Sequence, residues 1–234
     1  MTKQNIFFGK STNDIQKTFI SHFKTSINSS DLLKKKYELD YLHLGLSDNT
    51  LLVKGTDQSS LFHKAIYSTF DKANYLSSEF HRKYKELCLE VLEKIKKISE
   101  FYGEWAIQRF PTVRFHFPNN VSVFEFHRDS DYSHPLGEIN CFYAINECLN
   151  SSALQIEKNL GFEDYFPLNL KSGEYAILNT SIFKHGDFLN KTKKTRISMD
   201  FRFIPNYLLN KENVSLTKGI KFSSDSYFVL DKEI

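Results

Sequence analysis

A chain of 234 residues fits one globular domain and is long enough to bury a full hydrophobic core. Its 41% hydrophobic and 25% charged residues are ordinary for a soluble folded protein, and a formal charge of +3 is too small a bias to indicate nucleic-acid binding. No run of about 18 apolar residues and no signal peptide occurs, so we expect a cytoplasmic protein that neither crosses nor binds a membrane.

The chain has three cysteines, an odd number without CxxC spacing, and we expect reduced, buried thiols rather than disulfides or a zinc site. From about residue 12 to residue 103 the hydrophobic pattern is helical. It predicts helices over 13–27, 31–39 and 77–101, with Ser77 or Ser78 as the N-cap of the last one. The segment 45–60 is predicted to be a loop.

From residue 104 the pattern changes to short alternating runs rich in Val, Ile, Phe and Tyr, separated by turn signals. Strands are predicted at 104–110, 112–117, 121–127, 138–146, 153–157, 174–178 and 194–204. We therefore predict an α+β fold, a jelly-roll barrel with an N-terminal helical block. The expected division is a helical region at 1–103 that packs on the barrel, a β core at 104–205 and a C-terminal extension at 206–234, all within one compact domain.

The segment FEFHRDSDYSHPLGEIN contains His127 and Asp129, one residue apart. On a strand such residues face the same side, so an imidazole and a carboxylate can reach one ion. His185 follows a predicted strand 58 positions after His127 and is the predicted third ligand. Two histidines and one carboxylate leave the remaining coordination positions open, as non-haem iron oxygenases require.

The run TRISMDFRFIP alternates strictly, with Arg196, Ser198, Asp200 and Arg202 on one face. Such a face is usually solvated in an antiparallel sheet, but in a narrow barrel that holds a metal it can be the inner one. There Arg196 can pair with the far carboxylate of 2-oxoglutarate, and Ser198 can add a hydroxyl donor. The metal triad favours this second interpretation. Arg114, on another predicted strand, lines the cavity if its face turns inward.

The pattern HRDSDYSHPLGEIN, then SALQIE, GEYAIL and KHGDFLNKTKKTRISMDFRFIP, resembles the Fe(II)/2-oxoglutarate-dependent oxygenases of the streptomycin-biosynthesis type. The resemblance covers about residues 110–205 and does not extend to the helical part. It implies a double-stranded β-helix, with iron held by His127, Asp129 and His185. It also implies that Arg196 and Ser198 bind the distal carboxylate of 2-oxoglutarate.

Further site residues follow from the resemblance. Asn140 is predicted to contact the cosubstrate or the ligand sphere, and Tyr132, His134 and Glu138 are predicted to contact the substrate or shape the mouth of the site. Asp187 departs from the family pattern, in which Asn is expected at this position, and is predicted to change a hydrogen bond or a substrate contact rather than the metal.

The implied chemistry uses Fe(II), 2-oxoglutarate and dioxygen to hydroxylate a small polar metabolite, such as a sugar, an aminocyclitol or an amino-acid derivative. Oxidative ring closure or desaturation would use the same residues. The carboxylate of Asp129 disfavours the halogenating branch, which lacks that ligand. Helices packed on a barrel also offer a surface for a homodimer.

Three other functions share features of this sequence pattern. The tripeptide from His127 to Asp129 spells the HRD of protein kinases, but position 134 is His where the kinase loop needs Asn, so this reading is rejected. A cupin-like metal enzyme without 2-oxoglutarate shares the barrel and the triad but leaves Arg196 unexplained. A catalytically silent barrel that acts as a binding protein is disfavoured by the complete ligand set.

Overall fold

The computed structural model describes residues 2–29, 36–46, 60–71, 73–122, 125–209, 214, 219, 221–223 and 226–234. Its α-helices are α1 (Asn13–Asn28), α3 (Leu61–Phe70) and α4 (Glu79–Ser99). Short 3-10 helices run over Leu39–Gly45, Tyr75–Ser77, Asp129–Tyr132, Asn150–Ser152, Asn206–Leu208 and Asp231–Glu233. Among these residues, no helix has the length and apolar character needed to span a bilayer.

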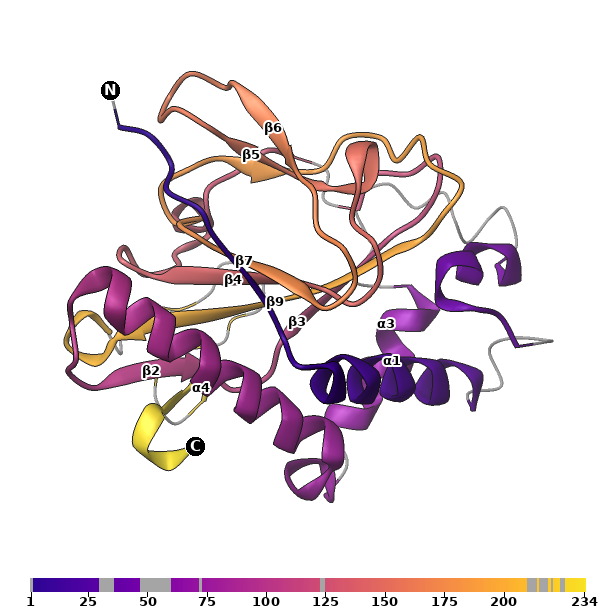
Figure 1. The fold of residues 1–234 in the computed structure, drawn as a ribbon, viewed down its shortest axis with the longest axis horizontal. Helices are drawn as coiled ribbons and strands as arrows, with labels where there is room; N and C mark the ends of the chain where they lie inside the picture. The colour runs from indigo at the N-terminus through magenta and orange to yellow at the C-terminus, as the bar shows by residue number, and fades with distance from the viewer. Residues whose placement is uncertain are drawn as a thin grey trace.

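Two antiparallel sheets form the β part of the molecule. In the larger sheet β1 (Phe7–Lys10), β7 (Glu174–Leu178), β4 (Ile139–Ala144), β9 (Arg196–Pro205), β2 (Trp105–Gln108) and β10 (Phe228–Leu230) follow one another, and β3 (Thr112–His116) also pairs with β9. The smaller sheet contains β6 (Tyr165–Leu168), β5 (Leu154–Glu157) and β8 (His185–Gly186). Figure 1 shows β5 and β6 opposite the larger sheet, on the side away from the helices.

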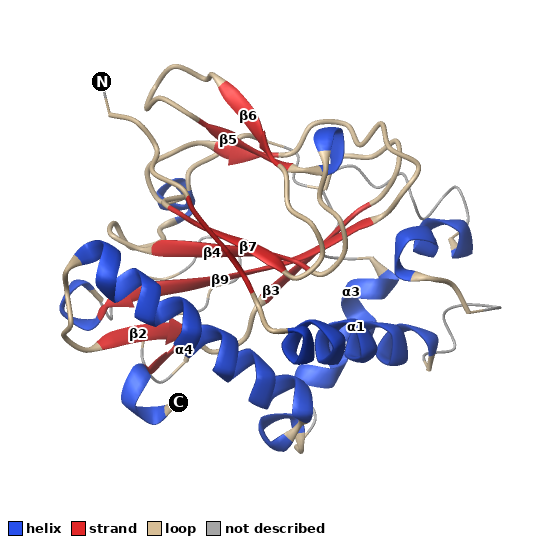
Figure 2. Cartoon of the chain, in the orientation of Figure 1, coloured by secondary structure: helices blue, strands red, loops and turns tan. Residues whose placement is uncertain are grey.

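The helices form a layer on the outer face of the larger sheet (Figure 2). Aromatic rings join the two layers: Phe19 of α1 meets Tyr143 of β4 with ring centroids 5.4 Å apart, and Tyr84 of α4 meets Phe201 of β9 at the same separation. Each such fully buried ring contributes on the order of 2–3 kcal/mol through removal of apolar surface from water. This packing fixes which face of β9 turns away from the helices.

The two faces of β9 lie as the metal-barrel interpretation predicts, with the polar face turned inward. Ile197, Met199, Phe201 and Phe203 lie in the core shared with the helices. The opposite face carries Arg196, Ser198, Asp200 and Arg202, and all four are buried between the sheets rather than solvated. A polar strand face that is buried must have partners within the protein, and those partners form the candidate site described below.

Several predicted elements agree with the structure. The helix expected at 13–27 is α1, and the helix expected at 77–101 is α4, whose N-cap is Ser78. The hydroxyl of Ser78 accepts a hydrogen bond from the backbone N–H of His81 at 3.1 Å. The three thiols, Cys88, Cys141 and Cys148, are free and buried, as expected.

Other predicted elements were wrong or fall partly outside the described residues. Residues 121, 122 and 125–127 form no strand, and only His127 makes an isolated bridge there; positions 123 and 124 are not described. The predicted helix at 31–39 lies mostly outside the described residues, and Leu39 begins a 3-10 helix instead. The predicted loop at 45–60 is largely outside them as well. Strands β1, β6, β8 and β10 and helix α3 were not anticipated.

Candidate metal centre

His127 and His185 form an isolated antiparallel bridge between the two parts of the chain that supply the site. Each backbone N–H donates to the other residue's carbonyl, at 3.0 Å from His127 and 2.9 Å from His185. His185 also belongs to β8, where it lies opposite Ile156 of β5. The imidazole rings are held with their centroids 4.5 Å apart. Backbone pairing, rather than a shared strand, therefore positions the two histidines.

Asp129 reaches the same point from the first residue of a 3-10 helix, so the expected strand geometry for His127 and Asp129 was wrong. Its backbone N–H donates to the carbonyl of Thr180 at 2.8 Å. The hydroxyl of Thr180 donates to Oδ2 of the same aspartate at 2.6 Å. These two contacts turn the other carboxylate oxygen, Oδ1, toward the histidines.

The donor atoms of His127, Asp129 and His185 lie within 4.8 Å of one another. Oδ1 of Asp129 is 3.9 Å from Nε2 of His127 and 3.6 Å from Nε2 of His185. Nitrogen and oxygen donors about 2.1 Å from one ion are roughly 3–4 Å from each other, so the two distances from Oδ1 of Asp129 fit a single divalent metal. The three side chains that the sequence singled out are thus brought together.

Protonation states in the site also suit metal binding. Burial lowers the pKa of His185 to about 4, against the opposing effect of Asp129, so its imidazole is neutral near pH 7. Burial would raise the pKa of Asp129, but Arg202 and His185 outweigh it and hold that pKa well below its usual range. Nδ1 of His127 lies 2.9 Å from the carbonyl of Glu125, a contact that, with the proton on Nδ1, leaves the Nε2 lone pair available.

Arg202 contacts Oδ2 of Asp129, the carboxylate oxygen that does not face the histidines. The sequence did not predict this contact. The guanidinium donates to Oδ2 of Asp129 from Nε and Nη2, at 3.3 and 3.2 Å. Its Nε is also 2.8 Å from Oε1 of Glu138, and its Nη1 donates to the hydroxyl of Tyr227 at 3.2 Å. The strict alternation of β9 was the available signal, because it placed Arg202 on the same face as Arg196.

The residues predicted to contact substrate lie at different depths. Glu138 is 1% exposed, accepts from His134 at 3.0 Å and pairs with Arg202, so it belongs to a buried charged cluster around Arg202 rather than to an open surface. Burial raises its pKa despite His134 and Arg202. Tyr132 is half-buried and packs edge-on against His127 with centroids 5.0 Å apart. Arg114 does face inward, 3.8 Å from Asp200.

The residues predicted to hold the cosubstrate differ in what surrounds them. Asn140 donates to the hydroxyl of Thr180 at 3.2 Å and so connects to Asp129 through one intermediate. Among the described residues, the buried hydroxyl of Ser198 and the side-chain oxygen of Asn140 have no hydrogen-bond partner. Buried polar atoms of this kind normally bind something, so both fit a polar ligand between the sheets.

Arg196 is less available to such a ligand, because its guanidinium already donates to another side chain. Its Nη1 donates to Oδ1 of Asp187 at 2.6 Å and its Nη2 to Oδ2 at 3.2 Å, so the guanidinium grips a carboxylate of the protein itself. Burial would raise the pKa of Asp187, but Arg196 and His116 outweigh it and lower that pKa. Asp187 therefore lies against the predicted cosubstrate arginine rather than at the mouth of the site.

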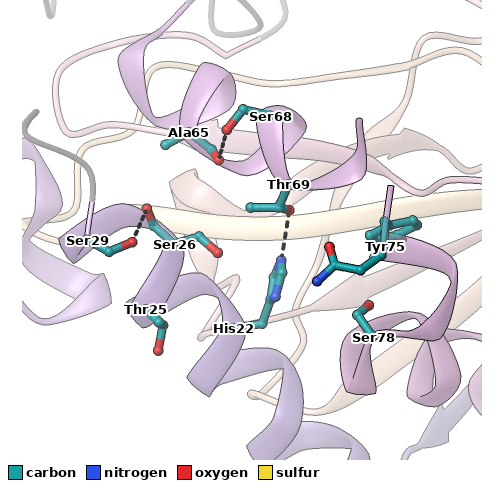
Figure 3. Close-up of a pocket in the computed structure, with 10 residues that line it drawn as sticks. His22, Thr25, Ser26, Ser29, Ala65, Ser68, Thr69, Tyr75 and Ser78 are labelled. Atoms are coloured by element: carbon teal, nitrogen blue, oxygen red, sulfur yellow. Dashed lines mark hydrogen bonds between the residues drawn. The ribbon is translucent and has the colours of Figure 1, made fainter. Parts of the chain in front are cut away.

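A separate hollow of about 380 Å³ lies among the helices (Figure 3). Hydroxyl groups line it, and two of them contact hydrogen-bonding groups of the helices themselves. Ser68 donates to the carbonyl of Ala65 at 2.9 Å, and Thr69 lies 3.2 Å from Nε2 of His22. No member of the metal triad lines this hollow. It does not carry the chemistry of the triad.

Comparison with known proteins agrees with this arrangement, although no family model matches the chain. The chain is 28% identical over 207 residues to the streptomycin biosynthesis protein StrG of Streptomyces griseus, which covers 87% of this chain and 93% of StrG. Among solved structures, the nickel complex of ThoJ, a non-heme monooxygenase, aligns over 92% of this chain and 80% of its own, with a TM-score of 0.51 and 9% identity. A prolyl-4-hydroxylase of Pseudomonas putida aligns over 86% and 92%, with a TM-score of 0.50 and 9% identity.

The structural likenesses, at 9% identity, concern the fold, whereas the match to StrG extends along nearly the whole sequence. Together they confirm the resemblance that the motifs around His127, His185 and Arg196 predict. The chain resembles a streptomycin-biosynthesis protein in sequence, and in fold it resembles a non-heme monooxygenase and a prolyl-4-hydroxylase.

Proposed function

We propose that this chain is a non-haem Fe(II) and 2-oxoglutarate-dependent oxygenase. The observation that carries the proposal is the convergence of His127, Asp129 and His185, whose donor atoms lie within 4.8 Å of one another. Two imidazoles and one carboxylate on one side of an ion are the ligand set of such enzymes. The remaining coordination positions are then available to other ligands.

We further propose that the two antiparallel sheets close into a double-stranded β-helix barrel, with residues 104–205 as its core. The helical region before it and the extension after it would support this core, and β1 and β10 already pair with its strands β7 and β2. A barrel of this kind supports the site from both sheets: β8 of the smaller sheet carries His185, and β9 of the larger sheet carries Arg202.

In this proposal His127, Asp129 and His185 hold the iron, and Ser198, Asn140 and Arg196 face the cosubstrate. When bound, iron with a 2-oxo acid and dioxygen supplies the oxidising power for an unactivated C–H bond. The residues of the chain position these groups. Thr180 and Arg202 hold Oδ2 of Asp129, which leaves its Oδ1 for the metal.

The substrate we propose is a small polar metabolite such as a sugar, an aminocyclitol or an amino-acid derivative, which is hydroxylated or oxidatively cyclised. The similarity to a streptomycin biosynthesis protein supports this class. Tyr132 and His127 lie together at the more exposed side of the triad, and Tyr132 is half-buried, so a substrate that approaches His127 would pass its ring.

A second candidate is a metal enzyme of the same fold that does not use 2-oxoglutarate. One observation favours it: the guanidinium of Arg196 is already paired with the carboxylate of Asp187. The two candidates share the metal and differ in whether a 2-oxo acid binds next to it.

The test is anaerobic titration of the metal-free protein with Fe(II) and then with 2-oxoglutarate to saturation, followed by the weak visible charge-transfer band. We expect the band in the wild type and in His22→Ala, which changes a histidine of the helical hollow. We expect none in His127→Ala. Tight Fe(II) binding without a band at any 2-oxoglutarate concentration would exclude the first candidate and favour the second.

A further inference from the structure

The guanidinium of Arg196 has protein acceptors on both of its terminal nitrogens. Nη1 donates to Oδ1 of Asp187 at 2.6 Å and to the carbonyl of Ser152 at 3.1 Å. Nη2 donates to Oδ2 of Asp187 at 3.2 Å and to the hydroxyl of Ser122 at 3.1 Å. The four N–H bonds of the guanidinium fork are therefore matched by four acceptors of the chain. A further carboxylate can bind this fork only if one of these acceptors is displaced.

Asp187 is held in place as firmly as its partner. The side chains of Arg196 and Asp187 are 1% and 0% exposed, so neither can exchange its partner for water. The hydroxyl of Ser122 donates to Oδ2 of Asp187, and Nδ1 of His116 lies 4.0 Å from Oδ1. Asp187 also follows Gly186 of β8, whose backbone is paired with β5. A short side chain on a paired backbone has little room to withdraw.

The pair changes the charge that a ligand would meet. Alone, a buried arginine attracts a carboxylate strongly, because the interior screens charge poorly. With Asp187 beside it the two charges cancel, and an incoming carboxylate meets a like charge on Asp187 as well as the cation. The attraction for a dicarboxylate over a monocarboxylate is thereby reduced at this end of the site.

We propose that Asp187 is a specificity-determining residue for the cosubstrate: it occupies the carboxylate position on Arg196 and makes the site accept 2-oxo acids that lack a distal carboxylate. This inference rests on the proposed function, since it concerns the 2-oxo acid that binds beside the metal. Ser198, whose buried hydroxyl has no partner among the described residues, offers the remaining polar contact for a small neutral end group.

The experiment measures the dissociation constants of 2-oxoglutarate and 2-oxopentanoate by calorimetry on the Ni(II)-loaded protein, without turnover. The two acids have the same five-carbon chain and differ in the distal carboxylate. We expect the wild type to bind them within about tenfold of each other. We expect Asp187→Asn to bind 2-oxoglutarate at least about tenfold more tightly than the wild type, with little change for 2-oxopentanoate.

Two further variants assign the effect to the ion pair. Asp71→Asn removes an equal charge from an exposed residue after α3 and is expected to leave both constants unchanged. Asp187→Asn combined with Arg196→Gln removes both charges and is expected to abolish the gain for 2-oxoglutarate. A gain that persists in this double variant would show that Arg196 is not the group released, and would overturn the inference.

The inference is also overturned if the wild type prefers 2-oxoglutarate by more than about tenfold, or if Asp187→Asn leaves its affinity unchanged. The comparison of the two acids on the wild type needs no variant, so it tests the inference even if Asp187→Asn does not fold. If Ni(II) binds but neither acid binds to any form, the proposed function fails and the inference fails with it. That outcome differs from equal binding of 2-oxoglutarate by wild type and variant, which overturns the inference alone.

Discussion

His127 and His185 donate backbone hydrogen bonds to each other's carbonyl groups, although 58 positions separate them in the chain. This reciprocal pair fixes, without a metal, the two backbone segments that carry the imidazoles. The backbone N–H of the third ligand, Asp129, is bonded to the carbonyl of Thr180, but its carboxylate is oriented by side-chain contacts with Thr180 and Arg202. The histidines are therefore set by backbone pairing and the carboxylate by its neighbours, and the two can be perturbed separately.

Thr180→Val is expected to weaken metal binding by about tenfold or more. The substitution preserves the size of the side chain but removes the hydroxyl that donates to Oδ2 of Asp129 at 2.6 Å, and partners of metal ligands typically affect affinity by this amount. Calorimetric titration with Ni(II) measures the effect. Thr25→Val, on the exposed face of α1, is the matched control. Equal affinities in the two variants would contradict the role given to Thr180.

Arg202→Gln is expected to lower the free energy of unfolding of the metal-free protein by about 3–5 kcal/mol. Loss of the guanidinium leaves the buried carboxylates of Asp129 and Glu138 without their common cation. Urea denaturation of the metal-free protein measures this directly. A change below about 1 kcal/mol would mean that the cluster tolerates the loss of its cation, for example by protonation of Glu138.

The metal-free protein is expected to lose stability as pH falls from about 6.5 to 4, partly through His81. Burial, with Lys85 and Arg109, lowers the pKa of His81 to about 4, and its place in the first turn of α4 also opposes a positive charge. In the unfolded chain the pKa of this histidine is near 6.5, so the unfolded state binds more protons in this window. The free energy of unfolding therefore decreases as pH decreases.

The share of His81 in that loss is expected to reach about 2–3 kcal/mol at pH 4. His81→Phe keeps a ring beside Tyr75 but cannot be protonated. Urea denaturation at a series of pH values, with chelator present, should therefore give a shallower decline for the variant. Parallel curves for the two proteins would exclude the contribution of His81.

Ser78→Ala is expected to destabilise the protein by about 1 kcal/mol, because it removes the N-cap of α4. The neighbouring Ser77→Ala is a matched control. The hydroxyl of Ser77 donates only to the carbonyl of Asn74 in an exposed turn, so a change within about 0.5 kcal/mol is expected. Urea denaturation of both variants distinguishes them. The reverse order would place the start of the helix one residue earlier.

Much of the site could be predicted because the residues that bind metal are few and their order in the chain is informative. The alternation of β9 identified Arg196, Ser198 and Arg202 as one face, and the triad indicated that this face is the inner one. The contact between Arg202 and Asp129 was not predicted, because alternation gives the face of a residue but not its partner across the sheet.

Other features depend on tertiary contacts that no local pattern encodes. β1 and β10 contain four and three residues and exist as strands only because β7 and β2 pair with them. Asp187 was recognised as unusual, but its pairing with Arg196 depends on how β8 lies against β9. The apparent strand at 121–127 has the right alternation, but among its described residues only His127 forms a backbone bridge with another part of the chain.

The central place of β9 has a consequence for synthesis on the ribosome. β2, β3 and β4 all pair with β9, yet each is translated well before residue 196. Until β9 emerges from the ribosome, these strands lack their common neighbour and present unpaired edges, which favour aggregation. Helices α1, α3 and α4 are translated before all of them and pack against the same sheet, so they can shield its apolar face in the nascent chain.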